Sequence, residues 1–227
     1  MTDRHITVAI DGPSGAGKST LARMSAKEFR LLYVDTGAIY RTVGLAAQRA
    51  GLGSRDAAGV IQLLPGLDIA MDYDRTGVQR MLLHGEDVSR EIRTPLSSIY
   101  ASDVSALPEV RAFLLEMQRR LAREHNVVMD GRDIGTVVLP DAGLKVFLTA
   151  GPEARARRRY RELVEKGTAC TLEEVLRDIQ YRDKNDSSRT AAPLRQAEDA
   201  VLLDTTDLSL EESAQALNTL IRERFGL

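Results

Sequence analysis

Short apolar runs alternate with longer amphipathic stretches along most of the chain. Five runs have the length and composition of buried strands: residues 5–10, 31–34, 126–129, 144–150 and 201–204. Apolar strands separated by helices are typical of a parallel sheet that is covered on both faces. We therefore predict an α/β protein with a five-stranded parallel sheet flanked by helices.

Helices are expected in the amphipathic stretches, at residues 19–29, about 38–50, about 95–107 and 108–124. We predict that Thr36 caps the second helix and that Gly51 closes it. Two later helices begin at capping boxes, Thr171-x-x-Glu174 and Ser209-x-x-Glu212.

The pattern changes between about residues 66 and 90. Two β-type runs, LDIAMDY and VQRMLLHGEDV, are separated by the turn Asp74-Arg75-Thr76-Gly77. This favours a small antiparallel hairpin or three-stranded sheet inserted between helices.

The stretch GPSGAGKS, from Gly12 to Ser19, follows the first strand and opens the first helix. It fits the phosphate-binding pattern G-x-x-x-x-G-K-[ST]. Gly12, Gly15 and Gly17 let phosphate oxygens approach the main chain, and the helix N-terminus favours the anion. Lys18 offers a cation to the β and γ phosphates, and Ser19 a hydroxyl to Mg²⁺. The loop predicts binding of a nucleoside triphosphate, which leaves kinase, GTPase, motor and ATPase open.

Charged residues follow two of the predicted strands. Asp130, Arg132 and Asp133 come at the exit of the strand at 126–129, where Asp130 could organise Mg²⁺ and Arg132 could clamp a phosphate. The alternative is a structural Arg–Asp network. Thr36 and Arg41 follow the second strand and could face an acceptor. They could equally be a helix cap and a solvated residue.

Two basic clusters flank a segment that contains Gly167 and Thr171. The first is RARRRYR at 155–161, which includes Arg158, and the second is RDKNDSSR at 182–189. On a helix, Arg182, Asp186 and Arg189 would share one face. The arrangement predicts a helical lid whose cations close over the transferring phosphate. The alternative is a solvated helix face or a surface for RNA.

Composition narrows the choice among these functions. The 227 residues carry a net charge of -2, which argues against a general grip on polymeric nucleic acid. No N-K-x-D element of a GTPase is present. The single cysteine, Cys170, excludes a disulfide within the chain, and no run reaches the ~18 apolar residues of a membrane span. We expect a cytoplasmic protein with no membrane partner.

Five ordered motifs resemble the bacterial cytidylate kinase family over essentially the whole chain: DGPSGAGKS, DTGAIYR, GEDVSREIRT, DGRDIGTVVLPDA, and R-D-x-x-D-x-x-R-x-x-x-P from Arg182 to Pro193. The resemblance implies a P-loop NTPase fold of the nucleoside monophosphate kinase type. It implies one kinase domain over 1–227, with a core at 1–62 and 109–227, a small β-containing monophosphate-binding insert at 63–108 and a lid at 155–190. We expect a monomer.

The resemblance also implies roles for single residues. Ser14, Lys18 and Ser19 belong to the ATP phosphate site, together with the loop glycines. The remaining assignments concern the acceptor. Its phosphate and ribose are assigned to Thr36, Arg41, Arg132 and Arg189, and its base to Ser102, Arg111 and Asp133. Its sugar or phosphate is assigned to Arg182 and Asp186, and Arg93 is expected to lie near the acceptor.

Two positions depart from the family pattern. Many members have Gly where this chain has Ser19, followed by Thr, so the hydroxyl that meets Mg²⁺ is left open between Ser19 and Thr20. Many have Ser where this chain has Thr36, which keeps a hydroxyl with different rotamers.

The activity implied is transfer of the γ-phosphate of ATP to CMP or dCMP, giving ADP and CDP or dCDP. Lys18, Arg132, Arg158 and Asp130 are the expected catalytic residues. Uracil would place a carbonyl against Asp133 where cytosine has its amino group, a mismatch that costs roughly 1–3 kcal/mol. Two rivals stay open: a UMP, AMP or shikimate-type kinase on the same scaffold, and a nucleotide-switched regulator or RNA-binding module. The preference between CMP and dCMP is left open.

Overall fold

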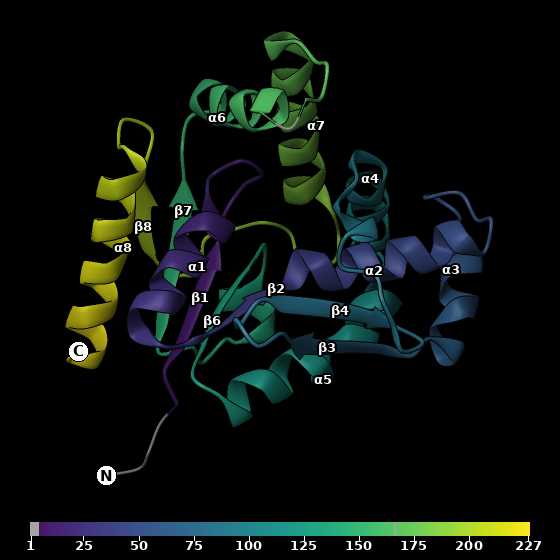
Figure 1. Ribbon diagram of the computed structural model, residues 1–227, viewed down its shortest axis with the longest axis horizontal. Helices are drawn as coiled ribbons and strands as arrows, with labels where there is room; N and C mark the ends of the chain where they lie inside the picture. The colour runs from purple at the N-terminus through teal and green to yellow at the C-terminus, as the bar shows by residue number, and fades with distance from the viewer. Residues whose placement is uncertain (1–4, 166) are drawn as a thin grey trace. The chain divides into compact units, whose positions relative to one another are not determined.

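The computed structural model, drawn in Figure 1, describes residues 5–165 and 167–227. These residues form two compact units. One unit combines the chain up to Tyr33 with Glu124–Leu227, and the other is Val34–Arg123. The second unit contains all of the insert that we predict at 63–108.

A five-stranded parallel sheet runs through the protein, as the apolar runs predict. Its strands stand in the order β2-β6-β1-β7-β8. β1 pairs in parallel with β6 and with β7, and β7 pairs in parallel with β8. Their bounds are β1 (Thr7–Asp11), β2 (Leu32–Asp35), β6 (Val127–Gly131), β7 (Leu144–Thr149) and β8 (Val201–Asp204). In the parallel β1–β6 pairing Ile10 lies opposite Asp130, and Asp11 lies opposite Gly131. Asp11 and Asp130 therefore lie at the same end of two neighbouring strands.

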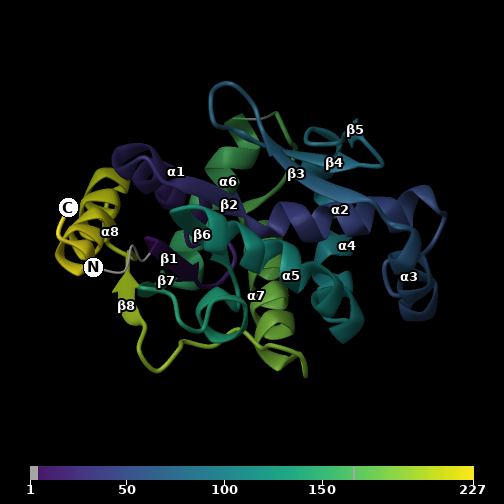
Figure 2. The same ribbon diagram turned by 90° about the horizontal axis from the view of Figure 1, so that it is seen from below.

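Helices α1 (Lys18–Phe29) and α8 (Leu210–Phe225) lie side by side and pack on the strands of the first unit (Figures 1 and 2). Their core combines apolar side chains of both helices with those of the strands: Val8, Ile10, Leu21, Ala22, Val146, Leu148, Leu217 and Ile221. Both predicted capping boxes are formed, at Thr171 and at Ser209.

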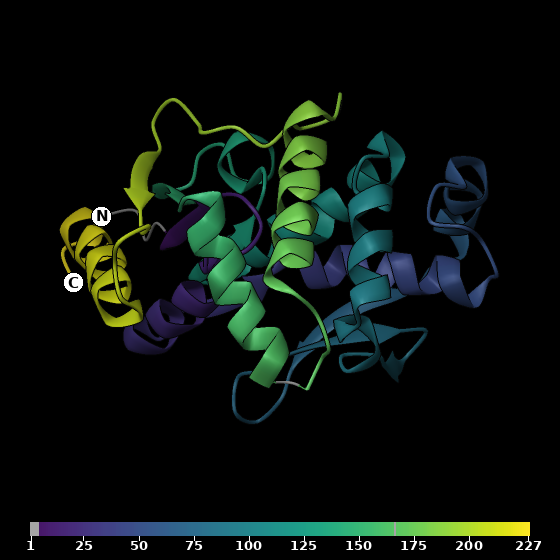
Figure 3. The same cartoon turned by 90° about the horizontal axis from the view of Figure 1, so that it is seen from above.

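Helices α6 (Pro152–Glu165) and α7 (Leu172–Ser188) run beside each other in the region predicted to be the lid (Figure 3). Val175 and Ile179 of α7 bury against Ala156 of α6, and Cys170 packs against this small cluster. A π-helical turn, η3 (Ile134–Val138), follows β6. The predicted lid is therefore helical, as expected, in α6 and α7. Its closing motion stays a prediction.

The second unit joins helices to a three-stranded antiparallel sheet, which settles the choice between hairpin and sheet (Figure 2). Its strands are β3 (Ile69–Tyr73), β4 (Gln79–Leu83) and β5 (Glu86–Asp87). Its helices are α2 (Thr36–Arg49), α3 (Ala57–Leu63), α4 (Pro95–Val104) and α5 (Pro108–Glu124), with short 3₁₀ turns η1 (Leu64–Gly66) and η2 (Glu91–Arg93). Side chains from both kinds of element form its core: Ile39, Val43, Met81, Leu83, Ile92, Val104 and Leu114.

Three details correct the sequence-based expectations. The N-cap of α2 is Asp35, whose carboxylate accepts from Ala38 N, so Thr36 is the first helical residue and not the cap. A carboxylate at this position competes well with a hydroxyl for the free amide groups of the first turn. Helix α3 was not predicted. Arg189 follows the end of α7 in extended backbone, so it does not share a helical face with Arg182 and Asp186.

Among the residues that the structure describes, no helix combines the length and the apolar character needed to cross a membrane.

Candidate active site

Three glycines of the loop between β1 and α1, namely Gly12, Gly15 and Gly17, have positive φ angles, a conformation that favours glycine. A Cβ on Gly12 would lie 1.9 Å from the carbonyl oxygen of Leu148 in β7. Gly17 is the N-cap of α1 and has φ +91°, in the left-handed region. No side chain caps the N-terminus of α1 at Gly17, so the positive end of this helix can favour an anion at the loop.

Lys18 is buried and folds back on the loop. Its Nζ donates to the carbonyl oxygens of Gly12, at 2.7 Å, and of Pro13, at 2.8 Å. Burial, with the positive charge of Arg132 nearby, lowers the pKa of Lys18 to about 7, although Asp130 and Asp186 act in the opposite direction. An incoming polyphosphate would offer this ammonium group stronger acceptors than two carbonyls.

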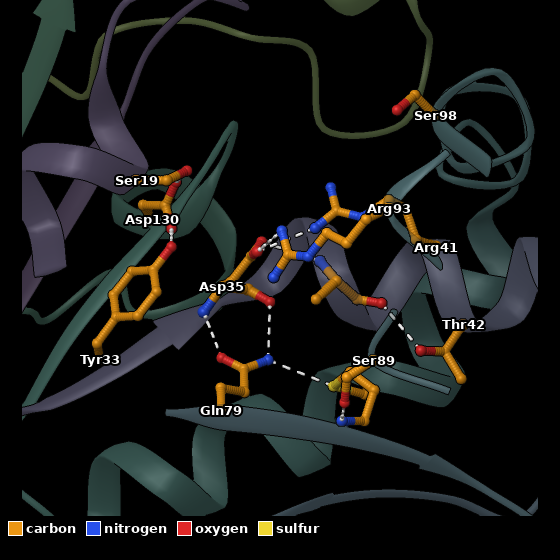
Figure 4. Close-up of polar contacts among 12 residues, drawn as sticks. Ser19, Tyr33, Asp35, Arg41, Thr42, Gln79, Ser89, Arg93, Ser98 and Asp130 are labelled. Atoms are coloured by element: carbon orange, nitrogen blue, oxygen red, sulfur yellow. Dashed lines mark hydrogen bonds and ion pairs between the residues drawn. The ribbon is translucent and has the colours of Figure 1, made fainter. Parts of the chain in front are cut away.

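Ser19 and Asp130 bring a hydroxyl and a carboxylate together at the edge of the sheet. Ser19 Oγ donates to Asp130 Oδ2 at 2.8 Å, and the hydroxyl of Tyr33 donates to Asp130 Oδ1 at 2.9 Å (Figure 4). Thr20 is exposed. Of the two hydroxyls left open by the sequence, it is Ser19 that faces the acidic group.

This pair of oxygen donors suits Mg²⁺, which prefers oxygen ligands and keeps several waters when it bridges to substrate phosphates. No group of three or more His, Cys, Asp or Glu side chains in the described part of the chain is arranged to hold a metal ion alone. The hydroxyl of Ser19 and the carboxylate of Asp130 fit a metal ion that keeps several of its waters and also contacts substrate phosphates.

Asp11, which the sequence analysis did not single out, ties the loop to the segment after β6. Its carboxylate accepts from the amides of Ile134 and Gly135, both at 2.7 Å. Burial raises the pKa of Asp11 to about 6, with a smaller contribution from the negative charge of Asp133, against the lowering effect of these hydrogen bonds and of Lys18. The sequence signal for this role of Asp11 is an acidic residue between an apolar strand and the glycine loop.

The charged residues after β6 are paired with the end of α7. Arg132 Nε donates to Asp186 Oδ2 at 2.6 Å, and Arg189 lies 3.8 Å from Asp133, between side chains that are both buried. Burial by itself would raise the pKa of Asp186, but the Arg132 guanidinium outweighs it and holds this pKa below its usual range. The structure thus brings together four of the predicted acceptor residues.

Arg182, on α7, forms an ion pair with Asp178 at 3.2 Å. Burial lowers the pKa of Arg182, and the positive charge of Arg132 lowers it further, while the carboxylates of Asp178 and Asp186 raise it. Its predicted role at the acceptor stays a prediction.

The basic cluster 155–161 divides between different partners. Arg158 donates to the Thr205 hydroxyl and main-chain oxygen and to Leu208 O, in the connection between β8 and α8. These contacts hold Arg158 at the connection between β8 and α8, and its catalytic role stays a prediction. Arg155 is buried and donates to Ser14 O, at 2.9 Å, and to Asp183, so it joins the glycine loop to α7.

In the second unit a carboxylate at the start of α2 holds two of the predicted acceptor residues, Arg41 and Arg93. Asp35 Oδ2 accepts from Arg41 Nη2 and from Arg93 Nη1, both at 2.9 Å (Figure 4). Burial opposes ionisation of Asp35, but the two guanidinium groups overcome it and lower its pKa. Arg41 and Arg93, which are far apart in sequence, are therefore held as a pair.

The residues predicted to read the acceptor base lie on other helices of this unit. Arg111, on α5, donates to Ser105 O at 3.2 Å and lies 5.6 Å from the centre of the Tyr40 ring. Ser102 is half-buried on α4, and Thr36 is buried at the start of α2. Tyr40 precedes Arg41 in α2, so Arg111 packs against the helix that carries one of the paired arginines.

Comparisons with known proteins point in one direction. The family model described as Cytidylate kinase matches residues 8–223. The Cytidylate kinase of Geobacter sp. (strain M21) is 50% identical over 226 residues, covering 100% of this chain and 97% of that protein. The Cytidylate kinase of Caldanaerobacter subterraneus subsp. tengcongensis is 49% identical over 98% of this chain and 97% of its own.

Among solved structures, a shikimate kinase from Acinetobacter baumannii in complex with shikimate matches with a TM-score of 0.46, at 18% identity, over 97% of this chain and 95% of that one. A likeness at this level says nothing about the acceptor. The family match spans nearly the whole sequence and includes the glycine loop, the Asp130 strand end and the Arg132–Asp186 pair, so this chain belongs to the cytidylate kinase family.

Proposed function

We propose that this chain transfers the γ-phosphate of ATP to CMP or dCMP with the help of Mg²⁺, using the residues described above. The observation that carries the proposal is the family match over residues 8–223. It is supported by a glycine loop in which Lys18 and Ser19 already face acidic or main-chain oxygen atoms.

For the donor, the amide groups of the glycine loop and the N-terminus of α1 would hold the phosphates of ATP. Lys18 would exchange its two carbonyl partners for the β- and γ-phosphate oxygens. Ser19 would hold the metal directly through its hydroxyl oxygen. Asp130 would accept a hydrogen bond from the Ser19 hydroxyl or from the waters of the metal. When bound, Mg²⁺ supplies positive charge that neutralises the phosphate oxygens.

For the acceptor phosphate, the guanidinium groups of Arg41, Arg93, Arg132 and Arg189 are the proposed partners. Each is paired with a carboxylate in the structure: Asp35 for the first two, Asp186 for Arg132 and Asp133 for Arg189. A guanidinium has five donors, so pairing with one carboxylate leaves others for a phosphate. Arg182, Asp186, Thr36 and Ser102 are proposed to contact the remaining parts of the acceptor.

Recognition of the base is assigned to two side chains. Asp133 would accept from the N4 amino group of cytosine, and Arg111 would donate to N3 or O2. Uracil would turn a carbonyl toward Asp133, leaving polar groups unpaired.

The chemical step is an in-line displacement. An oxygen of the acceptor phosphate forms a bond to the γ-phosphorus while the bond from that phosphorus to the bridging oxygen of ADP breaks. The attacking oxygen is already an anion near neutral pH, so no strong general base is required. Catalysis then depends on positioning and on neutralisation of charge by Lys18 and Arg132. Closure of the α6–α7 lid would exclude water that could otherwise hydrolyse ATP.

The test is a panel of acceptors, namely CMP, dCMP, UMP, AMP and shikimate, each with MgATP and a measurement of ADP release. We expect rapid turnover with CMP or dCMP and little ADP when no acceptor is present. Rapid turnover with AMP or shikimate in place of CMP would refute the acceptor assignment. Tight nucleotide binding with no CMP-dependent ADP would favour a nucleotide-switched regulator.

The proposal includes a monomer that works in the cytoplasm. Sedimentation equilibrium should therefore give a mass near the 25.0 kDa of one chain.

A further inference from the structure

The pair of arginines at the start of α2 depends on one buried carboxylate. Asp35 is 5% exposed, and its two oxygens accept from Ala38 N at 2.9 Å and from both Arg41 and Arg93. The side chains of Arg41 and Arg93 are 17% and 49% exposed, so part of each guanidinium can reach a ligand. A change in the position of Asp35 would therefore move both cations together.

The main chain of Asp35 is held by a side chain of the small inserted sheet. Gln79 Oε1 accepts from Asp35 N at 2.7 Å, and Gln79 Nε2 donates to Asp35 O at 3.2 Å (Figure 4). β2 is the last strand of the five-stranded sheet, so among the described residues one side of its main chain has no neighbouring strand. The amide of Gln79 has the same donor and acceptor as a peptide group and serves as a one-residue partner for this strand end.

Gln79 is itself fixed by its surroundings. It begins β4, lies opposite Tyr73 in the β3–β4 pairing and is 8% exposed. Its Nε2 also lies 3.3 Å from Met81 Sδ. Met81, two residues along β4, has its amide paired with Ser89 Oγ at 2.9 Å. A buried amide with both ends paired keeps one orientation.

We infer that Gln79 is a positioning residue for the acceptor phosphate: the inserted sheet sets the place of Asp35 through Gln79, and Asp35 sets the places of Arg41 and Arg93. This inference rests on the proposed function, in which these two arginines bind the acceptor phosphate. It gives the sheet of the insert a task in substrate binding, since preorganised cations bind a phosphate without first having to be ordered.

The direct test is Gln79→Met, which keeps the length of the side chain and removes both hydrogen bonds to Asp35. Loss of buried hydrogen bonds that align two binding groups should raise the KM for CMP about tenfold or more. The KM for ATP should stay unchanged, because Gln79 acts on the acceptor arginines alone.

Leu83→Ala is the matched structural control. Leu83 is 2% exposed at the other end of the same strand, and its truncation leaves a cavity that lowers the melting temperature of the unit. We expect Leu83→Ala to keep the KM for CMP within about twofold of the wild type, a change near the precision of such measurements. If Leu83→Ala and Gln79→Met raised this KM equally, Gln79 would be only a stabilising residue and the inference would be wrong.

Arg41→Met separates failure of the inference from failure of the proposed function. If Arg41→Met raises the KM for CMP and Gln79→Met does not, the inference fails while the proposed acceptor site stands. If Arg41→Met leaves this KM unchanged, the acceptor assignment fails and the inference fails with it. In the triple variant with Arg41→Met and Arg93→Met, the effect of Gln79→Met should largely disappear, because Gln79 acts through these two arginines. A full, independent effect there would overturn the proposed connection.

Discussion

Arg155 and Asp183 form a two-pronged ion pair between α6 and α7, with hydrogen bonds of 3.0 Å from Arg155 Nη1 and 2.6 Å from Arg155 Nη2. The same guanidinium donates to Ser14 O in the glycine loop and to Ala150 O at the end of β7. One buried cation thus joins both lid helices to the loop that would hold the donor phosphates.

Removal of this cation should destabilise the protein. Arg155→Met leaves a partly buried carboxylate and two main-chain oxygens without their donor, and breaking such a pair costs about 3–5 kcal/mol of the free energy of unfolding. Urea denaturation provides the measurement. Arg159→Met is the control, since Arg159 pairs with Glu162 between side chains that are 34% and 45% exposed, and this change should cost about 0–1 kcal/mol. Equal losses in the two variants would contradict the prediction.

The elements of the fold follow from the sequence because their causes are local. The central strand β6 is buried along its whole length, and its first three residues, Val127–Met129, form an apolar run. β8 departs from the prediction of a buried strand at 201–204: it is the last strand of the sheet, and Val201 and Leu202 are exposed although both are apolar. The capping boxes at Thr171 and Ser209 act within four residues and formed as predicted. The glycine loop carries its own backbone requirements, of which Gly12 against Leu148 is the clearest.

The partners of the charged residues could not be predicted in the same way. Arg93 meets Asp35 across 58 residues and Gln79 meets it across 44, and neither separation leaves a periodic signal. Arg155 and Arg158 belong to one basic run, yet the first is buried against Asp183 and the second is bonded to Thr205. The apolar residues Ala156, Tyr160 and Leu163 recur along α6 at the spacing of one helix face, and that face packs against α7. The stripe does not reveal the partner of each arginine, because Asp183 and Thr205 lie far along the chain from α6.

Substitution of Asp130 should raise the concentration of Mg²⁺ that the enzyme requires. Asp130 accepts from Ser19, the proposed metal ligand, and loss of such a supporting group typically costs about 10- to 100-fold in metal affinity or activity. We expect Asp130→Asn to raise the half-saturating Mg²⁺ concentration by this factor in an ADP-release assay. Ser19→Ala should shift it in the same direction. A shift in Thr20→Ala, with Ser19→Ala unchanged, would instead assign the metal to Thr20.

Arg132→Ala should lower kcat/KM for CMP by roughly a hundredfold, the usual loss for one preorganised donor to a transition-state charge. An unchanged kcat/KM would refute its assigned role. Arg158→Ala is the informative comparison, because Arg158 is bonded to Thr205 and Leu208. Those contacts favour a loss of stability with turnover largely kept, whereas a large loss of turnover would support the catalytic role predicted from sequence.

Asp11 should make the protein less stable as the pH rises from about 4 to 6. Its pKa is near 3.8 when unfolded and about 6 when folded, so within this window the native state binds more protons than the unfolded state. The free energy of unfolding then falls with rising pH, by about 3 kcal/mol for a shift of roughly two pKa units. The measurement is urea denaturation of the wild type and of Asp11→Asn at several pH values. The difference in the free energy of unfolding between the wild type and Asp11→Asn should decrease as the pH rises from about 4 to 6.

Asp186→Asn gives the comparison of opposite sign. The folded pKa of Asp186 lies below its usual value, so its contribution to stability is present above pH 3.8 and is lost as the pH falls through the folded pKa. The advantage of the wild type over Asp186→Asn should therefore shrink toward acid. The same sign in both variants would show that one of the two pKa directions is wrong.

Lys18 should take up a proton when ATP binds at pH 8. In the free protein its pKa is about 7, chiefly because of burial, so most of this amine is neutral at pH 8. The phosphates of ATP would favour its charged form and raise this pKa. Calorimetry in buffers of different ionisation enthalpy should then show uptake approaching about one proton per ATP bound, since a group one pKa unit below the pH is about nine-tenths deprotonated. In Lys18→Met, which lacks the titrating amine, ATP should bind more weakly and without this uptake. The same uptake in the variant would place the titrating group elsewhere in the loop, and no uptake in the wild type would mean that Lys18 is already charged before the nucleotide arrives.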